Sequence, residues 1–210
     1  REAAWQWGLF TSGQARGLGA TPQHLSSWCR RGLVDREAHG VYRMVGAPGD
    51  LRLDGLRIAW LNTAPDLWGH QRTTPSAVVS HLSAAYTVHG LGTASPGKDT
   101  LTVTESRRTR AETVHLHLAR AMAADDWQWI DGLPVTTLTR TVADLYVDGL
   151  DGGHLGDIIR DALCQGTAAH VLAAALDGVT EGRGRATLNQ SLATCAAPAS
   201  LALASDLLNL

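Results

Sequence analysis

The chain has 210 residues, of which 44% are hydrophobic and 18% charged, and its formal net charge is −2. These values are typical of a globular protein and exclude a disordered or collagen-like chain. The apolar runs are too short for a membrane-spanning helix, so no membrane partner is expected. Cys29, Cys164 and Cys195 are far apart and form no CxxC motif. This predicts reduced thiols and a cytoplasmic location.

The charges are distributed unevenly along the chain. Residues 1–60 contain eight arginines and five acidic residues, a net charge of +3, whereas residues 61–210 contain ten basic and fifteen acidic residues, a net charge of −5. Such asymmetry suggests that the N-terminal part meets a polyanion and the remainder does not.

The first thirty-two residues predict three short helices. The segment EAAWQWGLF (2–10) is expected to be the first. The second, TSGQARGLG, begins with a capping-box pattern of Thr11 and Gln14, with Gly19 at its end. The third, TPQHLSSWCRRG, has Thr21 as N-cap, Pro22 at the first helical position and a glycine beyond the end. Its buried stripe is predicted to be Leu25, Trp28 and Cys29, with the polar residues facing outward.

A β-hairpin is predicted next, because LVDREAHGVYRM contains two β-prone runs around His39-Gly40. Helix, turn, helix and hairpin is the order of a winged helix-turn-helix, whose last helix enters the DNA major groove. Small polar side chains and arginines can reach base edges and phosphates from such a helix. The predicted DNA-binding residues are Thr21, Gln23, His24, Ser26, Ser27, Arg30, Arg31, Arg36, His39 and Arg43. Surface arginines that only increase solubility are the alternative.

The segment VGAPGD (45–50) is interpreted as a linker because it is rich in glycine and proline. We therefore divide the chain into a DNA-binding domain, 1–46, and an α/β domain, 47–210, that should fold without the first. The second part predicts a helix over 51–62, a strand leading into a helix over 76–92, and strands at 99–106 and 112–119. A hairpin turning at Asp131-Gly132 and a helix over 136–147 follow. Helices at 155–164, 167–176, 185–196 and 200–210 complete an α+β fold with a helical C-terminal end.

The sequence resembles the AbiEi-type antitoxins of bacterial abortive-infection toxin–antitoxin systems. The resemblance covers roughly residues 8–148. It rests on the stretch GLFTSGQARGLGATPQHLSSWCRRGLVDREAHGVYRM and on two later blocks, VVSHLSAAYTVHGL and IDGLPVTTLTRTVADL. The final sixty residues are not covered.

The resemblance implies a DNA-binding antitoxin that represses its own operon by binding inverted repeats in double-stranded promoter DNA, as a homodimer or otherwise. It also implies that the second domain counteracts a nucleotidyltransferase-like toxin. Two alternatives stay open: a toxin-binding interaction module whose winged helix does not read DNA, and a DNA-targeted nuclease. The nuclease is disfavoured because no carboxylate-rich catalytic motif is present.

No enzyme activity, cofactor or metal is expected from the motifs. His115 and His117 alternate on a predicted strand and could form half of a metal site, but no third ligand follows at metal-like spacing, so a solvent-facing strand is the favoured interpretation. His81 is interpreted as a residue at a helix start that makes a local hydrogen bond. No GxSxG elbow or phosphate-binding glycine loop is present.

Overall fold

The computed structural model describes residues 2–72, 75–109, 111–119 and 121–195. The N-terminal part contains a 3₁₀ helix and short helices and strands in close succession. They are η1 (Glu2–Gln6), β1 (Leu9–Thr11), α1 (Ser12–Gly17), α2 (Pro22–Arg30), β2 (Val34–Ala38) and β3 (Val41–Met44). The strands form an antiparallel sheet in the order β1-β3-β2.

The rest of the chain is a five-stranded sheet with helices before and after it. The elements are α3 (Asp54–Thr63), η2 (Gly69–Gln71), β4 (Ala77–Val79), the π-helical segment η3 (Ser83–Val88), β5 (Asp99–Val103), β6 (Val114–Leu118), β7 (Trp127–Ile130), β8 (Leu133–Thr136), α4 (Leu138–Val147), α5 (Gly152–Cys164), α6 (Ala169–Thr180) and α7 (Gly184–Ala193). The strand order is β6-β5-β4-β8-β7. The β4–β8 and β5–β6 pairs are parallel and the other two pairs antiparallel. The fold is thus mixed α and β, as predicted.

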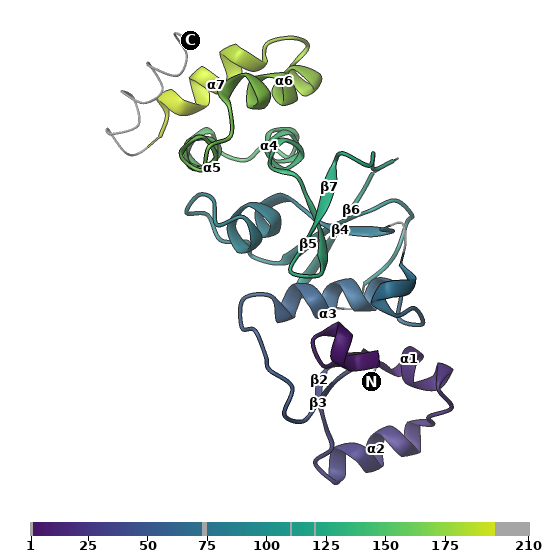
Figure 1. The fold of residues 1–210 in the computed structure, drawn as a ribbon. Coiled ribbons are helices and arrows are strands. Elements are labelled where there is room, and N and C mark those ends of the chain that lie inside the picture. Colours follow the sequence, from purple (N-terminus) through teal and green to yellow (C-terminus); the bar gives the residue numbers. More distant parts are fainter. Residues whose placement is uncertain (1, 73–74, 110, 120, 196–210) are drawn as a thin grey trace.

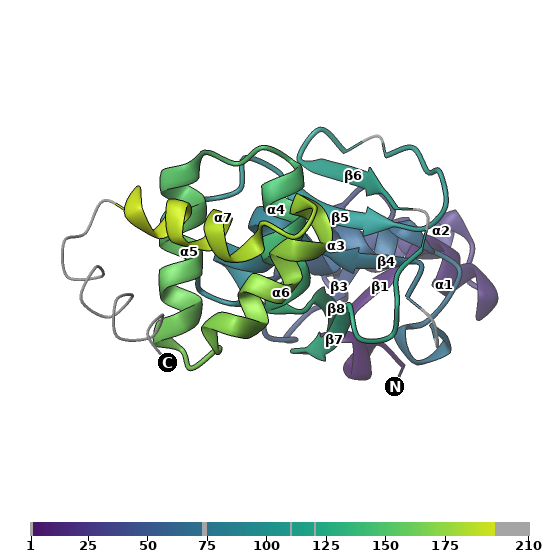
Figure 2. The same cartoon turned by 90° about the horizontal axis from the view of Figure 1, so that it is seen from above.

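The elements are arranged as layers along the molecule. Figure 1 shows α2 at one end, followed by the small sheet, α3, the large sheet and finally α6 and α7 at the other end. Seen from above, the helices α4 to α7 lie beside the large sheet (Figure 2). The surface formed by α2 is therefore far from the helical C-terminal end.

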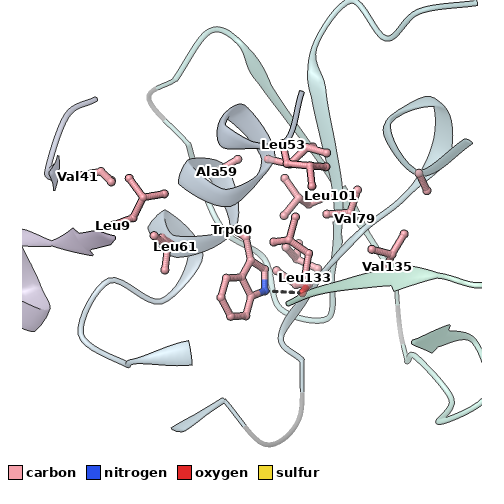
Figure 3. Packing of buried hydrophobic residues seen from close by; sticks show 14 residues of the cluster. Leu9, Val41, Leu53, Ala59, Trp60, Leu61, Val79, Leu101, Leu133 and Val135 are labelled. Atoms are coloured by element: carbon pink, nitrogen blue, oxygen red, sulfur yellow. Dashed lines mark hydrogen bonds between the residues drawn. The ribbon is translucent and has the colours of Figure 1, made fainter. Parts of the chain in front are cut away.

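One hydrophobic cluster joins the small sheet to the large one through α3. Leu9 of β1 and Val41 of β3 are fully buried in the same cluster as Leu53, Leu56 and Trp60. Figure 3 shows Leu9 and Val41 on one side of α3 and Val79, Leu101 and Val135 of the large sheet on the other. The Trp60 indole of α3 donates to the Ala77 carbonyl, 3.2 Å away, at the start of β4. A second cluster lies among η3 and α4 to α7.

Polar contacts also cross the predicted domain boundary. The buried amides of Gln6 and Gln14 bond to each other, and they reach the Gly69 N–H and the Leu67 carbonyl respectively. The hydroxyl of Thr11 donates to the Pro65 carbonyl. The boundary after residue 46 stays a prediction, but the expectation that residues 47–210 fold alone does not fit the shared core.

The prediction for residues 2–10 was wrong in part. The helix ends at Gln6, because Trp7 and Gly8 both have positive φ, and Leu9 begins a strand that pairs with β3. The Asp131-Gly132 hairpin is confirmed: both residues have positive φ, as a two-residue type I′ turn requires. The helix expected over 200–210 lies outside the described residues.

Candidate nucleic-acid interface

The ends of α2 are fixed by local hydrogen bonds that the sequence predicts. The Thr21 side chain accepts from the His24 backbone N–H at 3.3 Å, and the His24 ring accepts from the Thr21 N–H at 3.3 Å. Pro22 occupies the first turn, where its missing N–H has no helical partner to lose. At the other end, Gly32 has φ +64 and the Leu33 N–H donates to the Trp28 carbonyl. This bond is typical of a Schellman motif, which ends the helix directly after Arg30 and Arg31.

One side of α2 packs onto the small sheet and the other faces solvent. Leu25 is buried in a cluster with Phe10, Ala15 and Val34, and Trp28 and Cys29 pack against it while half-buried. The exposed side chains of the helix and its cap are Thr21, Pro22, Gln23, His24, Ser26, Arg30 and Arg31. Ser27, which was also predicted to face outward, is half-buried. The outer face is therefore polar and basic.

The β2–β3 hairpin brings two more of the predicted residues together. Arg36 and His39 are exposed, and the Arg36 guanidinium lies 3.4 Å from His39 Nδ1. The hairpin tip does not project freely, because the Gly40 carbonyl accepts the Ser12 backbone N–H at 2.8 Å. The tip is thus held against the start of α1.

Arg43 has a different environment from the other predicted arginines. It is 7% exposed and is paired with Glu37 and Asp54, with 2.6 Å between charged atoms in each pair. Its guanidinium also donates to the carbonyls of Trp7 and Pro48. Because every side of this cation is occupied within the protein, we remove Arg43 from the predicted DNA-binding set.

Three cations remain available on this surface. Among the described residues, Arg30, Arg31 and Arg36 form no ion pair with an acidic side chain, and all three are exposed. Arg16 at the end of α1 is exposed too, with a 3.9 Å pair to Asp66 that solvent weakens. Exposed arginines without strong partners can bind phosphate at little cost.

His115 and His117 were predicted to lie on a solvent-facing strand, and this is only partly confirmed. His115 is exposed, but His117 is half-buried and its ring stacks on that of His81, with 3.8 Å between centroids. The His81 ring bonds to Ser80 Oγ at 2.9 Å, as the predicted local bond requires. His81 and His117 are 36 residues apart in sequence, so spacing alone gave no signal of this contact.

The surface combines a short polar helix, a hairpin and exposed arginines, which together fit the class of nucleic-acid-binding regulators. Residues 1–45 match the family described as transcriptional regulator, AbiEi antitoxin. This confirms the family resemblance for the N-terminal part, and the family is by description one of regulators. The match ends before the later blocks, VVSHLSAAYTVHGL and IDGLPVTTLTRTVADL.

Similarity to a solved structure extends over most of the chain. The crystal structure of the RV2827C protein from Mycobacterium tuberculosis is similar with a TM-score of 0.55 and 16% sequence identity, covering 91% of this chain and 73% of that one. At this identity the similarity concerns the fold alone. No curated protein matches the sequence. Within the described ranges, no helix has the length and apolar character needed to cross a bilayer.

Proposed function

We propose that residues 1–46 form a winged helix-turn-helix that binds double-stranded DNA, and that the protein is an antitoxin that represses its own operon. The observation that carries the proposal is that the family match, residues 1–45, coincides with the unit in which α2 presents an exposed polar face. The order α1, α2 and β2–β3 hairpin is the order that such a domain requires.

Base readout is assigned to the first turns of α2. Gln23, His24 and Ser26 are exposed there, and glutamine and serine side chains can bond to base edges in the major groove. Thr21 is the N-cap of α2 and is exposed, so it lies where a phosphate would contact the N-terminus of the helix. Ser27 has less access because it is half-buried.

Phosphate binding is assigned to the arginines around the helix end and the hairpin. Arg30 is the last residue of α2 and Arg31 its C-cap, and Arg36 and His39 lie on the hairpin. Contacts of this kind position the protein and carry no sequence information by themselves. The first turns of α2 thus provide specificity, and the end of α2 together with the hairpin provides affinity.

The second part is assigned to counteracting a nucleotidyltransferase-like toxin and to dimer formation on inverted repeats. This assignment rests on the family resemblance. Rescue of growth in cells that express the toxin, by the wild type and by an Arg30→Gln/Arg31→Gln/Arg36→Gln variant, tests whether neutralisation depends on DNA binding. We expect both proteins to rescue growth.

The DNA-binding proposal is tested by fluorescence anisotropy with a duplex from upstream of the gene. The triple arginine variant should bind at least about tenfold more weakly, a change of about 1.4 kcal/mol or more. Arg183→Gln is the control, because Arg183 is exposed and precedes α7 at the other end of the molecule (Figure 1). If all variants bind the promoter like the wild type, or the wild type does not bind it, the proposal is wrong.

A further inference from the structure

Three side chains from distant segments meet at one point of the second part. His81 lies between β4 and η3, His117 lies on β6, and Asp148 caps the end of α4. One potential ligand atom from each lies within 4.8 Å of the other two. Two imidazoles and a carboxylate form a ligand set typical of zinc and other divalent transition metals.

The His81 ring is oriented so that one nitrogen is left for a ligand. Its Nδ1 is bonded to Ser80 Oγ, which in turn accepts a 2.9 Å hydrogen bond from the Thr102 hydroxyl. Metal-binding histidines commonly use one ring nitrogen for the ion and bond the other to a fixed partner. Ser80 serves as that partner here, so Nε2 of His81 remains for coordination.

The rings of His81 and His117 lie face to face, which favours the neutral form of both. Neutral imidazole is the ligand form, and two cationic rings stacked at 3.8 Å would repel. His81 also has φ +54, a backbone conformation that is uncommon for a residue other than glycine. Such backbone strain is often found at functional sites.

The cluster opens into a cavity of about 560 Å³. His81, His117 and Asp148 line it together with His115, Lys98 and Asp151. Asp144, one turn before Asp148 on α4, does not belong to the cluster, because its carboxylate is paired with Arg140 at 2.7 Å.

We propose that His81, His117 and Asp148 bind a divalent transition metal, with Zn²⁺ the ion that fits best. Tetrahedral zinc places its ligand atoms about 3.3 Å apart, so the three atoms must close by up to roughly 1.5 Å and the two rings must turn out of their stack. Three protein ligands leave one coordination position, which faces the cavity and would take water or an oxygen of a bound molecule. The site goes beyond DNA binding, because it lies in the second part of the chain.

The test is Zn²⁺ titration of the untagged full chain by calorimetry. We expect one Zn²⁺ per chain and an affinity lowered at least about tenfold in His117→Gln and in Asp148→Asn. His115→Gln is the matched control: this residue lies two positions away on β6 and lines the same cavity, yet it is outside the ligand set. Its affinity should stay within about threefold of wild type.

A further variant distinguishes the loss of a metal ligand from misfolding of the protein. His81→Asn removes the imidazole, but asparagine tolerates positive φ, so the fold should persist when checked by circular dichroism without metal. It should also lose at least tenfold in affinity. The proposal is overturned if the wild type binds much less than one ion, if the three ligand variants bind like the wild type, or if His115→Gln loses as much as they do.

Discussion

Arg43 of β3 and Asp54 of α3 form an ion pair of 2.6 Å that joins the small sheet to the central helix. Between them in sequence lies VGAPGD, the segment predicted to be a linker, and the Pro48 carbonyl of that segment accepts from the same guanidinium. The segment predicted to be a flexible linker is therefore fixed in place, because its backbone packs against the buried charge cluster around Arg43. Glu37 completes the cluster from β2.

Removing the cation from this cluster should destabilise the fold. Arg43→Gln leaves Glu37 and Asp54 without their partner, and breaking a buried ion pair in this way costs about 3–5 kcal/mol. Arg52→Gln is the control, because its 3.5 Å pair with Asp131 is half-exposed and should be worth about 0–1 kcal/mol. Urea unfolding measures both. Equal, small losses would show that Arg43 is not needed to join the two parts.

The shared core predicts that the C-terminal fragment 47–210 is not independently stable. Without Leu9 and Val41, the side of α3 that they cover is exposed to water, and Trp7 no longer packs edge-on against Trp60. The fragment should show weak near-ultraviolet dichroism and no cooperative urea transition. A fragment that unfolds as cooperatively as the full chain would contradict this and would restore the predicted division at residue 46.

Local patterns in the sequence predicted the helix ends well. Thr11 and Thr21 accept the capping bonds expected at the helix starts, and Pro22 occupies the first helical position. The glycines after the two helices donate the expected bonds to the last turn. The strand at Leu9 was missed because it depends on pairing with residues 41–43, although Gly8 in a predicted helix was a signal. Non-local pairing is what single-sequence patterns cannot supply.

Burial of Arg43 could have been recognised from alternation. Val41 and Arg43 are two apart on a strand and so share a face, and Val41 is fully buried. Arg43 was placed in the DNA-binding set because it lies on the return strand of the predicted hairpin. The cluster of His81, His117 and Asp148 gave no such signal, because its members come from the segment after β4, an edge strand and a helix end. Only sheet register and the packing of α4 bring them together.

The stability of the protein should fall as the pH is lowered below about 6.5. Burial lowers the pKa of His89 from its usual 6.5, although its Nε2 donates to the Thr136 carbonyl at 2.8 Å. As the pH falls, His89 is protonated in the unfolded chain before it is protonated in the folded one. The free energy of unfolding is therefore highest above pH 6.5 and decreases below it. Urea unfolding at pH 7.5, 6.5 and 5.5 measures the slope. His89→Gln should make it shallower, whereas an unchanged slope would assign the effect to other groups.

Sequence readout should depend on the exposed first turns of α2. Gln23→Ala or Ser26→Ala should cost about 1–3 kcal/mol on the promoter site and little on random DNA. Arg36→Ala should weaken binding to both DNAs alike, because a phosphate contact carries no sequence information. Competition anisotropy with the two duplexes measures the difference. Equal effects of all three substitutions on both DNAs would mean that α2 does not lie in the major groove.

The salt dependence of promoter binding tests the central claim, that this is a DNA-binding regulator, most directly. Arg30, Arg31 and Arg36 from two copies would neutralise about 4–6 phosphates, so the logarithm of the association constant should fall against the logarithm of salt concentration with a slope of about −4 to −5. The triple Arg30→Gln/Arg31→Gln/Arg36→Gln variant should bring the slope towards zero, and Arg183→Gln should leave it unchanged. A wild-type slope near zero, or one that the triple variant does not alter, would contradict DNA binding through this surface.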